Sequence, residues 1–237
     1  MYSGFTEFPK YLHEFRTSLA VCLLMVMTEH SRAEDCSPHS GSLEGLPILE
    51  VTIENNDIFD LEQENQKLWI HKWANKLHIN TRKNTIEEQL LFDARDGYNQ
   101  DLVRETERLL RSRNYIHEAE ITVEEVCGKG VNLTVVTTDN WTLTPSITAS
   151  RSGGETRTAL EIEESNLLGL GTEIKILSES DEKRDSNAFI YRDNNWFGNF
   201  KTLELELSDN SDGHVYKVDV ARPFIKQDSK YAWSVRP

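Results

Sequence analysis

Two histidines come nearest, in type and spacing, to forming a metal site in this 237-residue chain. His71 and His78 are seven residues apart, so a helix would place both on one face, where imidazole nitrogens can bind Zn²⁺. A zinc site requires further ligands, and none lies at a supporting spacing. The sequence therefore favours two partly exposed histidines and predicts no metal.

An aspartate-rich segment, Ser208-Asp209-Asn210-Ser211-Asp212-Gly213 followed by Asp219, has oxygen ligands of the kind that Ca²⁺ binds. The same composition is typical of a polar turn between two strands, which is the simpler interpretation. The sequence has no Gly-x-Ser-x-Gly elbow, no Gly-x-x-x-x-Gly-Lys-Ser/Thr loop and no His-Glu-x-x-His. We therefore expect neither an enzyme nor a bound cofactor.

An N-terminal apolar run predicts export. Lys10 and Arg16 precede residues 19–27, which are apolar, and Ser31-Arg32-Ala33 places small residues at the two positions that a signal peptidase recognises. The run is shorter than the ~20 residues of a spanning helix, which favours a cleaved signal peptide at 1–33 over a permanent anchor.

Two cysteines, Cys36 and Cys127, follow this signal, and an oxidising compartment favours their pairing. If the first and last strands of the domain predicted below lie parallel and adjacent, both cysteines come to the same end of its sheet. A Cys36–Cys127 disulfide and two separate thiols are the two alternatives.

The charge of the chain limits its partners. Lys and Arg number 26 against 40 Asp and Glu, which gives a net charge of −14. The signal contains three residues of each sign, so its removal leaves that net charge unchanged. Such an acidic chain repels phosphate, so we expect no nucleic-acid binding and no overall electrostatic attraction to anionic lipid. Beyond the signal, no segment is long and apolar enough for a spanning helix, so membrane insertion would require strands.

Hydrophobic periodicity predicts a mixed domain at 48–139, after a lead-in at 34–47 that is rich in Pro, Gly and Ser. Alternating apolar residues predict strands at 48–59, 115–126 and 131–138. Apolar residues three and four apart predict helices at 64–78 and 100–113, the second with Asn99 as its N-cap.

After Trp141 the period changes from helical spacing to two-residue alternation. In Thr156–Glu164, for example, Leu160 and Ile162 fall on one face and Glu161 on the other. The alternation predicts about seven strands, near 141–151, 155–165, 172–180, 186–194, 200–209, 214–222 and 230–236. Spanning strands and a soluble periplasmic sandwich share this pattern. The cluster of Trp196, Phe197 and Phe200 favours spanning strands, because aromatic residues gather at membrane interfaces.

Several segments, in this order and spacing, resemble a known family: Ala74–Arg82, Ile86 with Leu90-Leu91-Phe92, Gly97-Tyr98, Glu105–Arg111, Asn114-Tyr115-Ile116, Asn166–Thr172, Tyr191–Gly198 and Ala221–Phe224. The chain resembles the POTRA-containing outer-membrane assembly and transport proteins, which include BamA/TamA-like factors and two-partner secretion transporters. The resemblance implies an α+β POTRA domain (β-α-α-β-β) at 48–139. It also implies that 140–237 is part of an all-β, antiparallel transmembrane β-barrel.

The same resemblance implies assembly, insertion or translocation of polypeptides at a bacterial outer membrane, with the POTRA domain in the periplasm. The expected partners are unfolded outer-membrane or secreted polypeptides, outer-membrane lipid and accessory periplasmic proteins. The chain departs from the family in having room for one POTRA domain and about seven strands, where related barrels have about sixteen. We therefore expect a fragment or a truncated product.

The family also implies a working edge. Its outer strand corresponds here to Tyr115–Val126, where an extended client could add a strand through main-chain hydrogen bonds. This hypothesis gives the partner-binding residues Tyr115, Ile116, Ala119, Ile121 and Val123. The alternative is a soluble periplasmic binding module or β-sandwich protein without a membrane role.

Overall fold

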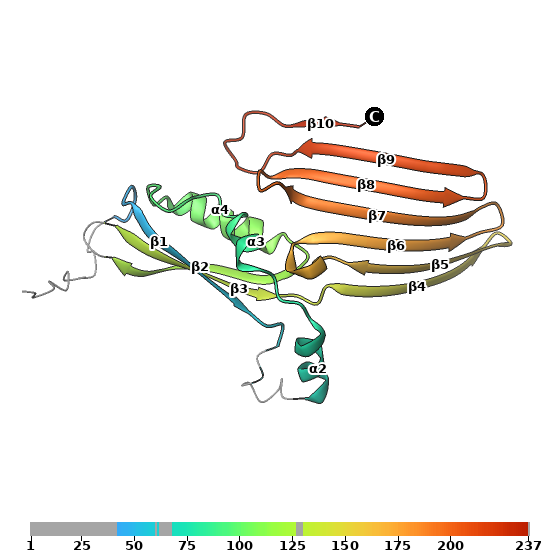
Figure 1. The fold of residues 1–237 in the computed structure, drawn as a ribbon, viewed down its shortest axis with the longest axis horizontal. Helices are drawn as coiled ribbons and strands as arrows, with labels where there is room; N and C mark the ends of the chain where they lie inside the picture. The colour runs from blue at the N-terminus through green and yellow to red at the C-terminus, as the bar shows by residue number, and fades with distance from the viewer. Residues whose placement is uncertain (1–41, 60, 62–67, 127–129, 237) are drawn as a thin grey trace, which may run out of the picture. The chain divides into compact units, whose positions relative to one another are not determined.

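The computed structural model describes residues 42–59, 61, 68–126 and 130–236, and Figure 1 shows the order of the elements. The predicted signal peptide, Cys36 and Cys127 lie outside the described residues. Of the predicted lead-in, the part from Ser42 onward is described.

Residues 42–139 form what we call the α+β region, built on a three-stranded sheet with the order β1-β3-β2. Strand β3 (Val131–Asp139) is central, β1 (Ile48–Asn56) pairs with it in parallel, and β2 (Ile116–Val126) pairs with it antiparallel. The first and last strands therefore lie parallel and adjacent, which is the condition that the disulfide hypothesis requires. In the central strand, the apolar residues Val131, Leu133 and Val135 belong to the core and are at most 1% exposed.

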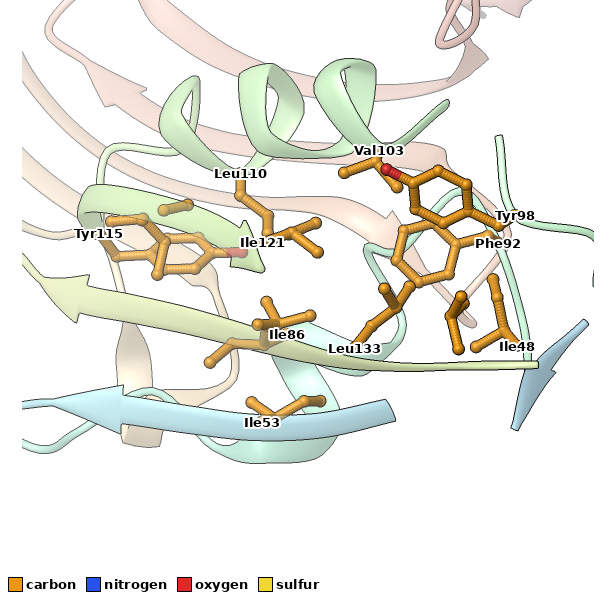
Figure 2. Close-up of a cluster of buried hydrophobic side chains, with 14 residues drawn as sticks. Ile48, Ile53, Ile86, Phe92, Tyr98, Val103, Leu110, Tyr115, Ile121 and Leu133 are labelled. Atoms are coloured by element: carbon orange, nitrogen blue, oxygen red, sulfur yellow. The ribbon is translucent and has the colours of Figure 1, made fainter. Parts of the chain in front are cut away.

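Helix α4 (Gln100–Arg111) covers this sheet, where the sequence predicted a helix. Asn99 caps it by accepting a hydrogen bond from the Leu102 N–H at 2.9 Å. Its apolar stripe is buried, and Figure 2 shows Val103 and Leu110 directed toward the strands. The predicted N-cap is confirmed.

A short helix that the sequence did not predict also contributes to the core. Helix α2 (Trp69–Leu77) is present, yet the exposed fractions of Trp69 and Trp73 are 72% and 58%. The short helix α3 (Lys83–Glu87), which the sequence analysis missed, supplies Ile86 to the core at 1% exposure. Helical spacing identifies an apolar face but not what covers it.

Residues 143–235 form a seven-stranded antiparallel sheet in which strands follow chain order (Figure 1). The strands are β4 (Leu143–Ser152), β5 (Glu155–Glu164), β6 (Thr172–Ser180), β7 (Asp185–Trp196), β8 (Lys201–Asn210), β9 (Gly213–Arg222) and β10 (Trp233–Val235). All seven lie where alternation placed them, although the last has three residues. Within the described residues, β4 and β10 each pair on one side, so the sheet is open. None of the described helices has the length and apolar character needed to cross a membrane.

Candidate functional site

One face of the seven-stranded sheet receives apolar side chains from every strand. Residues paired directly across two strands share a face, so the register fixes its membership. We call this set the apolar face: Leu143, Ile147, Leu160, Ile162, Ile174, Ile176, Phe189, Tyr191, Leu203, Leu205, Leu207, Tyr216, Val218, Val220, Trp233 and Val235.

The apolar face is open in this chain. Ile147 is 82% exposed, Tyr216 is 76% exposed and Ile176 is 56% exposed, and these residues come from three different strands. A soluble monomer rarely exposes a continuous apolar surface of this extent, so such a face marks contact with lipid or with another protein.

The opposite face, which we call the polar face, has a ladder of ion pairs across its central strands. Lys175 on β6 lies 2.6 Å from Glu163 on β5, and Arg192 on β7 lies 2.9 Å from Glu204 on β8. Lys217 on β9 continues the ladder at 2.5 Å from Glu204. Each exposed pair adds at most about 1 kcal/mol of stability. The ladder places the charges of the middle of these strands on the polar face, while the charged residues of the apolar face, such as Glu164, Asp193 and Arg222, lie near strand ends.

Aromatic side chains gather at one end of the sheet. The pairs Leu143 with Glu164, Thr172 with Asp193 and Arg222 with Trp233 place the same end of each strand together. We call this the aromatic end, and its members are Trp141, Trp196, Phe197, Phe224, Tyr231 and Trp233. Exposed fractions of 77% for Phe197 and 65% for Tyr231 show that several of these rings are uncovered.

The turn between β5 and β6 joins the sheet to the α+β region. Asn166, 2% exposed, donates from Nδ2 to Thr81 Oγ1 at 2.8 Å and accepts from the Gly171 N–H at 2.7 Å. The carbonyl of Gly169 accepts from the Arg82 N–H and from Thr85 Oγ1, both at 3.0 Å. These contacts fix the turn against the start of α3.

Gly169 is required in this turn by both conformation and space. Its φ is +74°, which favours glycine, and a Cβ there would lie 2.4 Å from the carbonyl oxygen of Asn80. Next to this contact, buried Asp139 accepts from the Thr81 N–H at 2.6 Å and lies 2.9 Å from His78 Nε2. The end of β3 and the segment after α2 are thereby tied together.

Tyr115, predicted to bind a partner, instead lies buried beneath this turn. Its hydroxyl accepts a hydrogen bond from Gln89 Nε2 at 3.0 Å, and a Cβ on Gly171 would lie 2.6 Å from that hydroxyl. Burial raises the pKa of Tyr115 to about 12. Arg113 Nε donates to Gln89 Oε1 at 2.7 Å, and burial lowers the pKa of Arg113. The surroundings of Tyr115 suit a structural role.

The other predicted partner-binding side chains also point inward. Ile116, Ala119 and Ile121 are at most 9% exposed and belong to the core, while Val123 packs against it partly buried. Strand β2 does lie at an edge of its sheet, as the hypothesis requires. What it offers a partner is backbone, because its apolar side chains are occupied.

Helix α4 already satisfies part of that backbone. The Ile121 N–H donates to Glu107 Oε1 at 2.9 Å, and the Ala119 carbonyl accepts from Arg111 Nη1. Glu107 and Arg111 also form an i,i+4 ion pair at 3.8 Å. An added strand would have to displace both side chains. The i,i+4 spacing of Glu107 and Arg111 is visible in the sequence, but their contact with β2 is not.

The candidate metal residues do not meet. The ring of His71 stacks on Phe59 with centroids 4.3 Å apart, while His78 contacts Asp139. Across the described ranges, no three His, Cys, Asp or Glu side chains are grouped to hold a metal. The aspartate-rich segment forms the turn between β8 and β9, where Asn210 pairs with Gly213, as the simpler interpretation predicted.

Comparison with protein-family models and with curated proteins gives no match. Among solved structures, the crystal structure of BamA from Haemophilus ducreyi lacking POTRA domains 1–3 is similar at TM-score 0.45 and 12% identity, over 72% of this chain and 32% of that chain. CdiB from Acinetobacter baumannii is similar at TM-score 0.48 and 11% identity, over 78% of this chain and 35% of that chain. This chain thus spans about a third of each. Both TM-scores are below 0.5, so neither similarity establishes a family.

Proposed function

We propose that this chain belongs to an outer-membrane protein that assembles, inserts or translocates polypeptides, with residues 140–237 spanning the membrane as part of a barrel. The observation that carries the proposal is the exposed apolar face, which crosses all seven strands opposite a polar face with ion pairs. A transmembrane barrel has this arrangement, with apolar residues toward lipid and polar residues toward the lumen.

The aromatic end supports the same orientation. Rings of Trp and Tyr concentrate where a membrane meets water, because one part of each ring system is apolar and another is polar. Trp141 and Trp233 lie at this end on opposite edges of the sheet. The α+β region would therefore stand on the periplasmic side, next to these rings, as the POTRA domain that the sequence resembles.

Client binding at β2 would act through backbone alone. Main-chain hydrogen bonds make no demand on client sequence, which suits a protein with many polypeptide clients. Here the client strand would replace the bonds that Glu107 and Arg111 make to Ile121 and Ala119. The cost of displacing them, added to the entropy of ordering the client, makes the expected affinity weak.

A matched pair of substitutions on β4 tests the membrane role. Ile147 and Ser146 are adjacent, lie on opposite faces, and are both exposed, so neither change disturbs packing. Ile147→Lys places a charge toward lipid, which costs about 2–4 kcal/mol near the membrane centre, whereas Ser146→Lys faces the lumen. In fractionated cells of a didermal bacterium, we expect the first variant alone to be lost from the outer membrane.

The opposite result would favour the alternative. If the parent chain is recovered entirely in the soluble periplasmic fraction, the protein is a soluble binding module or β-sandwich protein. Equal membrane recovery of the Ile147→Lys and Ser146→Lys variants would also contradict contact between the apolar face and lipid.

A further inference from the structure

Helix α2 contacts the rest of the chain through polar side chains and exposes Trp69 and Trp73. His71 stacks on Phe59, and Asn75 donates to the Phe59 carbonyl at 2.8 Å and accepts from the Phe59 N–H at 3.2 Å. Residues two apart on a helix lie about 200° apart, so Trp69 and Trp73 are on nearly the opposite side. Both rings are more than half exposed. An amphipathic helix in this orientation needs an apolar surface outside the chain.

The charge around these two rings is basic. The helix contains Lys72 and Lys76 and no acidic residue, in a chain with a net charge of −14. At about 100° per residue, both lysines lie on the part of the helix surface next to Trp69, and both are exposed. Basic residues beside tryptophan are typical of helices that lie in the surface of an anionic bilayer.

The helix is tied to the aromatic end of the sheet. Its C-cap is His78, which contacts Asp139, two residues before Trp141. His78 and Ile79 also line one hollow together with Trp141 and Leu143, the first residue of the apolar face. The five tryptophans of the chain therefore lie either on α2 or at the aromatic end. This continuity puts α2 at the level where the proposed membrane meets water.

We propose that α2 lies in the surface of an anionic phospholipid bilayer, with Trp69 and Trp73 at the boundary between headgroups and acyl chains. Lys72 and Lys76 contact the lipid phosphates. The helix would hold the α+β region against the membrane surface. This inference rests on the proposed membrane role of the sheet. Anionic lipid phosphates can pair with the two lysines, whereas the apolar face of a second copy of this chain would offer them mainly apolar side chains.

Tryptophan quenching by brominated lipid tests the position of the helix. In the full chain, replacing Trp141, Trp196 and Trp233 by Phe leaves Trp69 and Trp73 as reporters. The chain is added to vesicles of phosphatidylcholine with phosphatidylglycerol, brominated either near the headgroup or near the acyl terminus. We expect strong quenching by the shallow bromine and weaker quenching by the deep one.

The lysine contribution is measured in the same reporter chain. Lys72→Gln/Lys76→Gln should bind the anionic vesicles roughly thirty-fold more weakly, because each lysine near such a surface strengthens binding by roughly five-fold. Arg104→Gln/Lys183→Gln removes the same charge from exposed residues away from α2 and the aromatic end, and should leave binding nearly unchanged. Equal weakening in both variants would mean that overall charge, not α2, governs binding.

Protease protection of the sheet in the same vesicles separates this inference from the proposed function. A protected sheet with unquenched Trp69 and Trp73 would overturn the position of α2 and leave the membrane role intact. An unprotected sheet with quenched reporters would overturn the membrane role of the sheet while keeping the helix on lipid. If the two rings respond to an added unfolded polypeptide or to self-association but not to bromine, the helix docks protein and the inference is wrong.

Discussion

The α+β region and the seven-stranded sheet use apolar residues in opposite ways. In the α+β region, Leu133 and Leu110 are each 1% exposed, because α3 and α4 cover the three strands. In the sheet, Leu160 and Leu207 are each 50% exposed although they alternate with polar residues just as regularly. Alternation therefore indicates that a strand has one apolar and one polar face, but not whether the apolar face is covered by the protein itself. The first region buries its apolar residues within the chain, while the second leaves them exposed, as the proposed membrane role requires.

The largest expected effect comes from truncating one leucine in each region. Leu133→Ala removes a buried side chain from the central strand and should lower the free energy of unfolding by about 2–5 kcal/mol. Leu160→Ala changes a half-exposed residue of the apolar face and should change it by less than about 1 kcal/mol in aqueous or detergent solution. Denaturant titration followed by circular dichroism measures both. Similar losses would mean that both regions have closed cores.

A second difference is expected at high pH. The pKa of Tyr115 is about 12 when folded, against about 10 in an unfolded chain, so folding favours the neutral phenol. The stabilisation is complete below pH 10 and is lost as pH rises toward 12, on the order of 2–3 kcal/mol. Denaturant titrations at pH 9 and pH 11.5 should show this loss in the parent. Tyr115→Phe should remove the part of this loss that Tyr115 contributes and leave the part due to Tyr98, whose pKa burial also raises. A variant as sensitive as the parent would contradict the assignment.

The contact between the two regions can be weakened at one glycine. Gly169→Ala adds a Cβ that meets the Asn80 carbonyl at 2.4 Å, whereas Gly153→Ala, also at positive φ, meets nothing within 4 Å. Both variants share a backbone cost of about 1 kcal/mol, and the first should lose a further 1–3 kcal/mol or so. Hydrogen exchange at Arg82 and Thr85 should rise in Gly169→Ala alone. Equal exchange in both variants would show that this turn does not hold the regions together.

The smallest effect concerns the edge of β2. Glu107→Ala removes the acceptor of the Ile121 N–H and should cost about 1 kcal/mol, while freeing that edge for an added strand. Arg104→Ala, on the exposed side of α4, is the control. Binding of an unfolded outer-membrane polypeptide should be tighter for Glu107→Ala than for the control. Unchanged binding would argue that clients do not add at β2.

Much of the fold could be predicted because its patterns are local. The alternation of apolar and polar residues located all seven strands of the sheet, and the Asn99 cap located α4. The position of β2 at an edge followed from the resemblance. These features depend on neighbouring residues and on a small set of sheet topologies.

The candidate site was harder to predict, since it depends on contacts between distant segments. The bond from Asn166 to Thr81 joins residues 85 positions apart, and no periodicity indicates it. Burial of Tyr115 beneath Gly171 likewise depends on a segment more than fifty residues away, and no local pattern indicates it. Exposure of α2 was not predictable, because the competing helix α3 is too short to show a helical period.

Lipid contact along β4 is the most direct test of the claim that the apolar face meets the membrane. In a chain whose five tryptophans are replaced by Phe, single tryptophans are introduced as Ser146→Trp, Ile147→Trp and Thr148→Trp. Quenching by lipids brominated deep in the acyl chain should be strong at 147 and weak at 146 and 148. Equal quenching at all three positions, or none at 147, would contradict the claim.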